Sequence, residues 1–348
     1  MDRIANKFPR LLKFSGNIFI AIGFLGMTIT LVYLFKSTYN LLFIPQAPPG
    51  LAPVLPGVAI AGLPKLSFWH WLIAILIVAT IHEFCHGIYS RLIKVKIKST
   101  GFAFLGPILA AFVEPDEKQL NKKKTKEQLQ VLVAGPMANI LMAGIVLLLL
   151  VYAFSPIASK MVDIKGIEIA GIDNNLPINN TGIKAGDIIE KINGVIIDDV
   201  NKIKATIKDM HAGEIVNVQT DKGNYEVILG KNEKEETVLG VSLIGYETEV
   251  KEKYKYIHPV FSWIGLLLFW LFNISFGVGL FNLLPLGPVD GGRMFYAAAL
   301  HFLKDKTKAT RLLGFVSMFI LLLIFINMWP FIWKLLQFIL SPLIALLL

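Results

Sequence analysis

Three side chains at the end of one apolar stretch have the types and spacing of a catalytic metal site. They are His82, Glu83 and His86, in the segment TIHEFCH that follows the apolar run FWHWLIAILIVA. In an α-helix, residues four apart lie about 40° apart round the axis and one turn along, so both imidazoles can ligate one ion. Glu83 lies about 100° round from His82, where its carboxylate can reach a water activated by the ion.

The alternative is a chance pattern that has already emerged into the headgroup region, since Arg91 follows closely. Ionisable side chains at membrane depth are rare and tend to mark function. Cys85, the only cysteine, points the other way round the helix and is expected to pack rather than to ligate. The pattern therefore favours a zinc site with Glu83 as its general base.

The composition indicates a multi-pass α-helical membrane protein. The chain has 348 residues, of which 55% are hydrophobic and 17% charged. The apolar residues gather in blocks of about 20, the length that spans a bilayer as a helix. The net charge of +9 needs no nucleic-acid partner, because the basic residues cluster at the ends of these blocks. We expect about six spans, at 14–35, 66–90, 128–154, 258–284, 309–329 and 331–348, the last broken by Pro342.

Lysine and arginine orient these blocks. They gather before the first block, in residues 91–127 and in residues 293–311. Cytoplasmic loops carry this excess, and strict alternation across six blocks puts all three segments on one side. The sequence thus predicts a plasma-membrane protein with a cytoplasmic N-terminus. The Pro-rich stretch before residue 66 and residues 156–257 would lie outside.

Residues 156–257 read as a small soluble α+β domain. Short β-branched runs such as GDIIEKINGVII and NYEVILG are separated by Gly, Asn and Asp, which is typical of strands and turns. DDVNKIKATIKDM between them predicts one short amphipathic helix.

A hydrolytic zinc site needs a third protein ligand. The best candidate is Asp290, in FNLLPLGPVDGGR at the cytoplasmic end of the fourth block, the same side as His82. This Pro/Gly-rich segment cannot be regular helix, and broken backbone at membrane depth lines a cavity or is buried in protein. His301 is another candidate for the third ligand, but it lies among lysines. The alternative role for Asp290 is a structural one, as the N-cap of a helix.

The third block contains VLVAGPMANILMAG, whose small residues let membrane helices pack closely. Asn139 is its polar exception. Its amide could orient a metal ligand or donate to a substrate carbonyl.

HEFCH, AGPMAN and NLLPLGPVDGG, in this order on separate spans, resemble the site-2 protease family of intramembrane zinc metalloproteases. NNTGIKAGDIIEKINGVII resembles the PDZ domains that many members carry between these spans, and TGFAFLGPILAAFVEPDE resembles the family's re-entrant loop. The resemblance covers nearly all of residues 66–295, and only Val289, where the family usually has Leu, departs from it.

The resemblance implies that His82, His86 and Asp290 bind one Zn²⁺ and that Glu83 is the base. It implies that Asn282 helps to hold the substrate, and we assign Asn139 to substrate binding as well. The substrate would be a transmembrane protein or peptide within the bilayer, trimmed first by another protease. Water attack on a peptide bond in a transmembrane segment is the expected reaction.

The resemblance and the block pattern together divide the chain into five parts. They are a first helix with its Pro-rich loop (1–65), the first part of the catalytic core (66–155), a PDZ-like domain (156–250), the second part of the core (251–304) and C-terminal helices (305–348).

Two other functions remain open at this point. One is a metallopeptidase that cuts at the membrane surface with a Glu as third ligand, although the blocks after residue 257 contain no Glu. The other is a metal-dependent binding or transport protein with a PDZ partner module, which would have no need of Glu83 beside two histidines.

Overall fold

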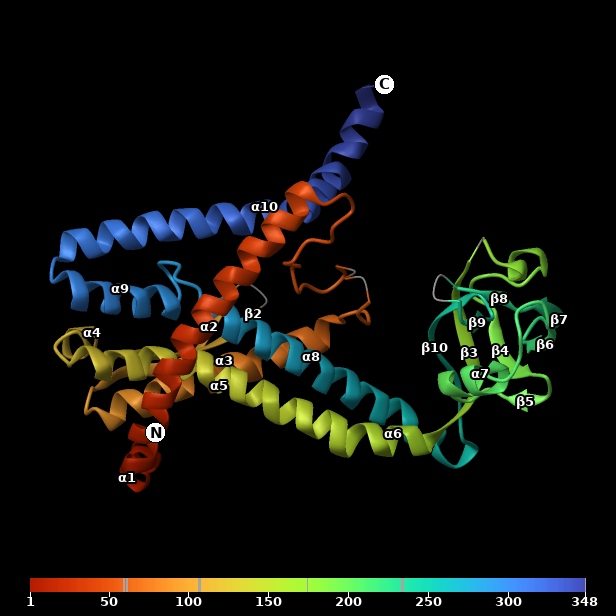
Figure 1. Cartoon of the computed structure of the whole chain (residues 1–348). Helices are drawn as coiled ribbons and strands as arrows, with labels where there is room; N and C mark the ends of the chain where they lie inside the picture. The colour runs from red at the N-terminus through yellow and green to blue at the C-terminus, as the bar shows by residue number, and fades with distance from the viewer. Residues whose placement is uncertain (59, 61, 106–107, 174, 233–234, 348) are drawn as a thin grey trace. The chain divides into compact units, whose positions relative to one another are not determined.

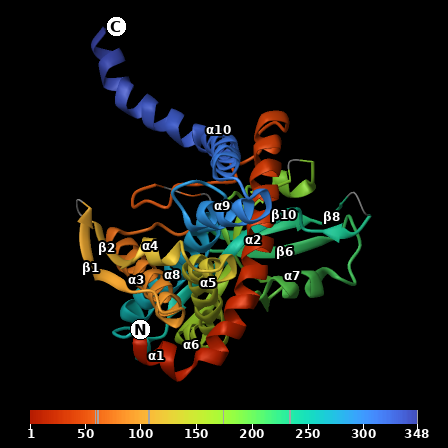
Figure 2. The ribbon, with the colours of Figure 1, turned by 90° about the vertical axis from the view of Figure 1, so that its left-hand side faces the viewer.

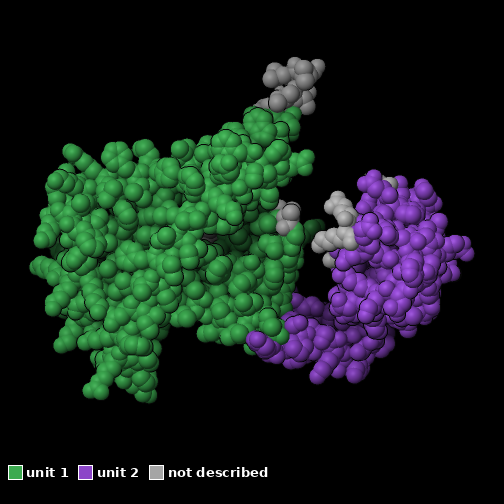
Figure 3. Space-filling model, viewed as in Figure 1, with its two compact units in different colours: residues 1–151, 264–348 green, residues 152–263 purple. Residues whose placement is uncertain are grey.

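The chain folds into two compact units. The computed structural model describes residues 1–348 except 59, 61, 106–107, 174, 233–234 and 348. One unit, which we call the helical unit, comprises residues 1–151 and 264–348, and the other, the soluble unit, comprises residues 152–263 (Figure 3). The sequence placed the PDZ-like domain at 156–250, and the strands of the soluble unit run from Val162 to Val250.

Long apolar helices make up the helical unit (Figure 1). Five of the described helices are long and apolar enough to cross a membrane, which agrees with a multi-pass membrane protein. They leave large apolar side chains exposed, among them Phe35, Phe315 and Met318, as a surface in contact with lipid would. The helices are α1 (Asp2–Lys7), α2 (Pro9–Phe43), α3 (Phe68–Leu92), α4 (Glu117–Leu120), α5 (Thr125–Leu149), α8 (His258–Asn282), α9 (Asp290–Leu303) and α10 (Lys306–Leu347).

The C-terminal region differs from the prediction. The blocks at 309–329 and 331–348 were expected to be separate, with a break at Pro342, but α10 is a single helix from Lys306 to Leu347. An internal proline removes one backbone hydrogen bond, and this loss does not end α10, whose bounds include both Pro330 and Pro342. Five long helices therefore stand where six spans were predicted.

Apolar cores hold together the helices that carry the motifs, and two of these cores involve α3, α5, α8 and α9. Trp270, which is 1% exposed, lies in a core with Ala74 and Val78 of α3 and Met142 of α5. A second core joins α2, α5 and α9 through residues that include Val133 and Met294. These contacts fix the faces of α3 and α5 that carry the polar side chains of interest.

Residues 97–115 form a β-hairpin in the place where the sequence predicted a re-entrant loop. β1 (Ile97–Leu105) pairs antiparallel with β2 (Ile108–Pro115), with Thr100 opposite Val113. The hairpin lies at one side of the helical unit, with β2 beside α3 (Figure 2). One edge of β2 is paired with β1, so its other edge is available to groups on α3.

The soluble unit is a small antiparallel sheet with one helix. The strand order is β10-β3-β4-β6-β7, with β5 paired to β4, and β8 and β9 form a separate pair. Its core consists of buried isoleucines and valines, as the alternating runs predicted. The elements are α6 (Ser155–Met161), β3 (Val162–Ile172), β4 (Ile188–Ile192), β5 (Val195–Ile196), α7 (Val200–Ile207), β6 (Ile215–Thr220), β7 (Gly223–Ile228), β8 (Gly230–Lys231), β9 (Thr237–Val238) and β10 (Val241–Val250), with short helical turns at Leu150–Phe154, Pro177–Asn180 and Glu252–Tyr254.

Asp187 is the one buried carboxylate among the described residues of the soluble unit. Burial opposes its ionisation, but its bonds from the Lys222 ammonium and the Lys184 backbone N–H outweigh this effect and lower its pKa. Lys184 lies in the loop before β4 and Lys222 in the turn between β6 and β7, so Asp187 joins these two loops rather than forming a site.

Candidate metal centre

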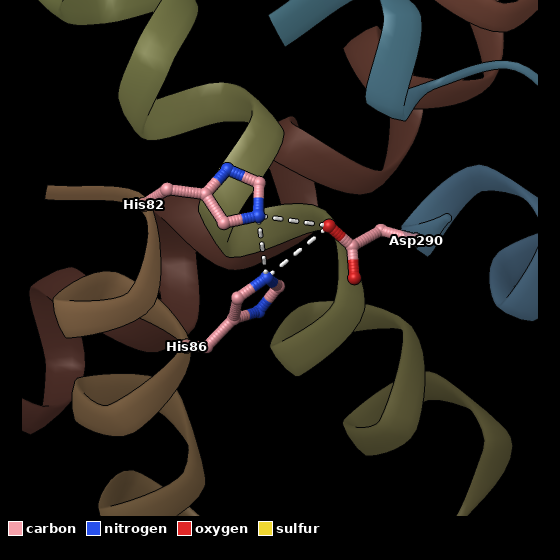
Figure 4. Close-up of side chains that lie close together, drawn as sticks. All are labelled: His82, His86 and Asp290. Carbon is pink, nitrogen blue, oxygen red and sulfur yellow. Dashed lines mark hydrogen bonds and ion pairs between the residues drawn. The ribbon is translucent and has the colours of Figure 1, made fainter. Parts of the chain in front are cut away.

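Two helices bring three metal-binding side chains to one point. His82 and His86 project from the same face of α3, and Asp290 reaches them from the first turn of α9 (Figure 4). Asp290 Oδ2 lies 3.0 Å from His82 Nε2 and 3.2 Å from His86 Nε2, and the two Nε2 atoms are 3.1 Å apart. Among the described residues, this is the one group of three or more His, Cys, Asp or Glu side chains with such geometry.

Asp290 reaches the histidines because the chain before it folds tightly back on α9. A Cβ at Gly291 would overlap the backbone of Leu283 and Leu284, and one at Gly292 would overlap the backbone of Leu286. Only glycine allows this approach, and Asp290 precedes the pair directly. The chain between α8 and α9 thus packs against the start of α9, and Asp290 is the first residue of that helix.

The donor set fits a metal ion. His86 Nδ1 lies 2.7 Å from the carbonyl oxygen of Val131, which can only accept, so Nδ1 carries the proton. The lone pair of neutral His86 is therefore on Nε2, where it faces His82 Nε2 and the Asp290 carboxylate. Atoms so close together need a shared proton or a shared metal ion between them. His82, His86 and Asp290 would hold one zinc ion through these three atoms.

Glu83 lies beside this group and is held by the hairpin. Its Oε2 accepts a hydrogen bond of 3.0 Å from the backbone N–H of Val113 in β2. Glu83, His86 and Asp290 line one polar cavity of about 390 Å³. The cavity is completed by Phe112, Val113, Glu114, Pro115, Glu117, Leu120, Val131, Leu132 and Arg293. A carboxylate, a metal-ligating face and a free strand edge therefore meet in one space.

The two asparagines that were predicted to bind substrate lie on α5 and α8. Asn139 of α5 is fully buried and its Nδ2 is 3.0 Å from His82 Nδ1. Asn282 ends α8, and its Nδ2 donates to the carbonyl of Val278 on the same helix. Neither residue lines the cavity that contains Glu83. His301 lies in the last turn of α9 and is not in the three-ligand group.

Several groups at the site escape a reading of the sequence. Gly135 of α5 faces both imidazoles so closely that a Cβ would lie 2.6 Å from His82 Nε2. The Val131 carbonyl and the Val113 N–H are backbone groups, which carry no residue-type signal. Arg293, three residues after Asp290, donates to Glu117 at 3.0 Å on the cavity wall. In the sequence, the one feature that could have placed Arg293 at the site is its position one helical turn after Asp290 on α9.

Comparison with known proteins agrees with the motifs. Residues 70–326, more than half of the chain, match the model of peptidase family M50. The chain belongs to peptidase family M50. The predicted resemblance to site-2 proteases is thereby confirmed.

Relatives within and near this family differ in how far they align. An uncharacterised protein of Methanocaldococcus jannaschii is 30% identical over 65% of this chain and 56% of its own length. A putative zinc metalloprotease of Clostridium acetobutylicum is 30% identical over 36% of this chain and 37% of its own. The zinc metalloprotease RasP of Shouchella clausii is 23% identical over 62% of both chains. The chain thus spans less than two thirds of each relative.

Two solved structures that resemble this chain each cover less than a quarter of it. The PDZ domain of an SdrC-like protein from Listeria monocytogenes covers 24% of this chain and 90% of its own, with 18% identity and a TM-score of 0.22. A protein of Geobacillus thermodenitrificans covers 22% and 95%, with 26% identity and a TM-score of 0.20. The PDZ-like character of the soluble unit stays a prediction.

Proposed function

We propose that this M50 protein is an intramembrane zinc metalloendopeptidase that cuts transmembrane segments of other proteins. The observation that carries the proposal is that Glu83 lines one polar cavity with His86 and Asp290, which form a three-ligand group with His82. A soluble metallopeptidase has no reason to place such a cavity among helices of membrane-spanning length.

His82, His86 and Asp290 would hold one zinc ion. When bound, zinc acidifies water and polarises the carbonyl of the scissile bond. Glu83 Oε2 takes a proton from the attacking water and passes it to the leaving amine nitrogen.

The substrate backbone would be held by β2. Hydrolysis requires an unwound peptide, and each unpaired N–H or C=O is costly in an apolar setting. The Val113 N–H points away from β1 and towards Glu83, so the unpaired edge of β2 faces the cavity. A substrate strand that adds to this edge would regain its hydrogen bonds and lie beside the base. Asn282 would contact the substrate next to Asp290.

The rest of the assignment follows from the charge pattern of the chain. The protein would span the plasma membrane with its N-terminus in the cytoplasm and the soluble unit outside. Its substrates would be membrane proteins already shortened by another protease. The competing function is metal-dependent binding or transport. A surface peptidase with a glutamate as third ligand is disfavoured, because the third side chain of the ligand group is Asp290.

Metal removal tests the proposal. We expect the purified chain in liposomes to cut a single-span reporter within its apolar segment, as mapped by mass spectrometry. A chelator should abolish the cut and added Zn²⁺ should restore it, because zinc supplies the activated water. A cut that survives chelation, or that always lies outside the apolar segment, would contradict the assignment. Stoichiometric zinc without cleavage of any of several reporters would favour the binding protein.

The soluble unit contains a groove suited to a peptide. A cavity of about 490 Å³ lies between α7 and the segment from Glu236 to Leu243. Its lining is mostly apolar and includes three charged residues, Lys204, Lys208 and Glu236. Such a groove fits an extended peptide with an apolar end and a terminal carboxylate. The alternative role for the soluble unit is to exclude substrates with bulky ectodomains from the active site.

Peptide binding separates these two roles. We expect a labelled peptide with an apolar C-terminal residue to bind the full-length chain, and its C-terminal amide to bind more weakly, because the amide lacks the negative charge. Lys204→Glu should weaken binding of the free acid roughly fivefold, since Lys204 is solvent-exposed. Lys202→Glu, on the same helix and outside the groove, is the matched control. Equal binding of acid and amide would favour the size filter.

A further inference from the structure

Asn139 is the one side chain described in contact with the Nδ1 atom of His82. It comes from α5 and is fully buried, and its Nδ2 lies 3.0 Å from His82 Nδ1. Ser275 of α8 donates to the Asn139 backbone carbonyl at 2.8 Å, which anchors this turn of α5. The contact is thus part of a packed interior and not of the cavity wall.

Metal binding by His82 determines which atom of the Asn139 carboxamide must face His82 Nδ1. To ligate through Nε2, His82 needs its lone pair there and its proton on Nδ1. A proton on Nδ1 requires an acceptor, and an amide nitrogen cannot accept. Asn139 Oδ1 is buried and has no hydrogen-bond partner in the described part of the chain. Rotation of the carboxamide by 180° brings this free oxygen to His82 Nδ1.

The second histidine supports this arrangement. His86 Nδ1 donates to the Val131 carbonyl, which belongs to the same helix α5. Gly135 lies between Val131 and Asn139 and allows α5 to approach both imidazoles. With the carboxamide rotated in this way, α5 would present an acceptor to the Nδ1 atom of each metal-binding histidine, the Val131 carbonyl to His86 and the Asn139 carboxamide to His82. Such partners fix the tautomer and the ring orientation of a ligand.

We propose that Asn139 is a positioning residue that accepts a hydrogen bond from His82 Nδ1 through Oδ1 and so presents His82 Nε2 to the metal. This inference rests on the proposed metal centre. It decides between the two roles left open by the sequence, because a side chain with no exposed surface outside the cavity does not reach a substrate carbonyl.

Zinc affinity of the full-length chain in detergent, measured by competition with a chromophoric chelator, tests the proposal. Asn139→Leu removes the acceptor at similar volume and should weaken zinc binding roughly 10–100-fold. Asn139→Asp keeps an oxygen acceptor and, when ionised, has no donor, so it should retain an affinity close to that of the wild type. Ser275→Ala, which removes a contact to the Asn139 backbone and leaves the carboxamide in place, should stay within about twofold.

Each outcome bears on a different claim. Wild-type zinc affinity in a folded Asn139→Leu would overturn the inference. If the Leu variant fails to fold, Asn139→Asp decides alone, because a residue needed as a donor would lose zinc when its nitrogen is replaced. Affinities in the expected order without any peptide cleavage would support the positioning role and overturn the protease. A wild-type chain that binds no zinc would overturn both.

Discussion

The Glu83→Gln variant should bind zinc as the wild type does and lose roughly 10²–10⁴-fold or more in kcat/KM for a single-span reporter. Glutamine has the size of glutamate, and its Oε1 can still accept from the Val113 N–H, so the contact with β2 survives. What the variant lacks is a group that takes a proton from water. The ion remains because Glu83 is not among the three ligand side chains.

A second carboxylate at the same cavity provides the control. Glu114 lines the cavity and accepts from Ser99 of the neighbouring strand, so Glu114→Gln removes a negative charge without removing the proposed base. We expect it to keep most of the activity. The rates come from the reporter assay and the zinc content from elemental analysis of the same samples. Cleavage by Glu83→Gln within tenfold of the wild type would rule out Glu83 as the base.

The Gly135→Ala variant should lose its zinc. A methyl group at this position would overlap His86 Nε2 and lie 2.6 Å from His82 Nε2, in the space from which an ion must contact both atoms. Neither the rigid α5 backbone nor the imidazoles, held through their Nδ1 atoms, can move away cheaply. The loss of affinity should exceed the roughly 10–100-fold typical of changes to groups that orient a ligand.

Gly144→Ala is the matched control for this change. Gly144 lies on the same helix, and a Cβ there would meet nothing within 4 Å. Both substitutions raise helix propensity equally, so they differ only in what surrounds the new methyl group. Zinc content measured after purification, with thermal unfolding as a check of folding, distinguishes the two. A Gly135→Ala chain with a full complement of zinc would show that α5 does not enclose the metal position.

The large features of this protein were predictable from local patterns. Apolar blocks of membrane-spanning length, a β-rich insertion and His-Glu-x-x-His on one helix each depend on residue type and periodicity within a short segment. Asp290 also stood out, because a carboxylate in a Pro/Gly-rich break at the end of an apolar block is unusual. Where a local rule was applied to a single proline, as at Pro342, the prediction was wrong, since α10 continues through it.

The sequence by itself determined which side chains could bind a metal and on which helix two of them lie. Only the tertiary structure decided that Asp290 is 3.0 Å from His82, that Val113 donates to Glu83 and that α5 brings groups to the Nδ1 atoms of both histidines. The physical reason is that these contacts join segments far apart in the chain, and several use backbone atoms that every residue has. Their partners are set by how the helices and the hairpin pack, which no local pattern of residue types encodes.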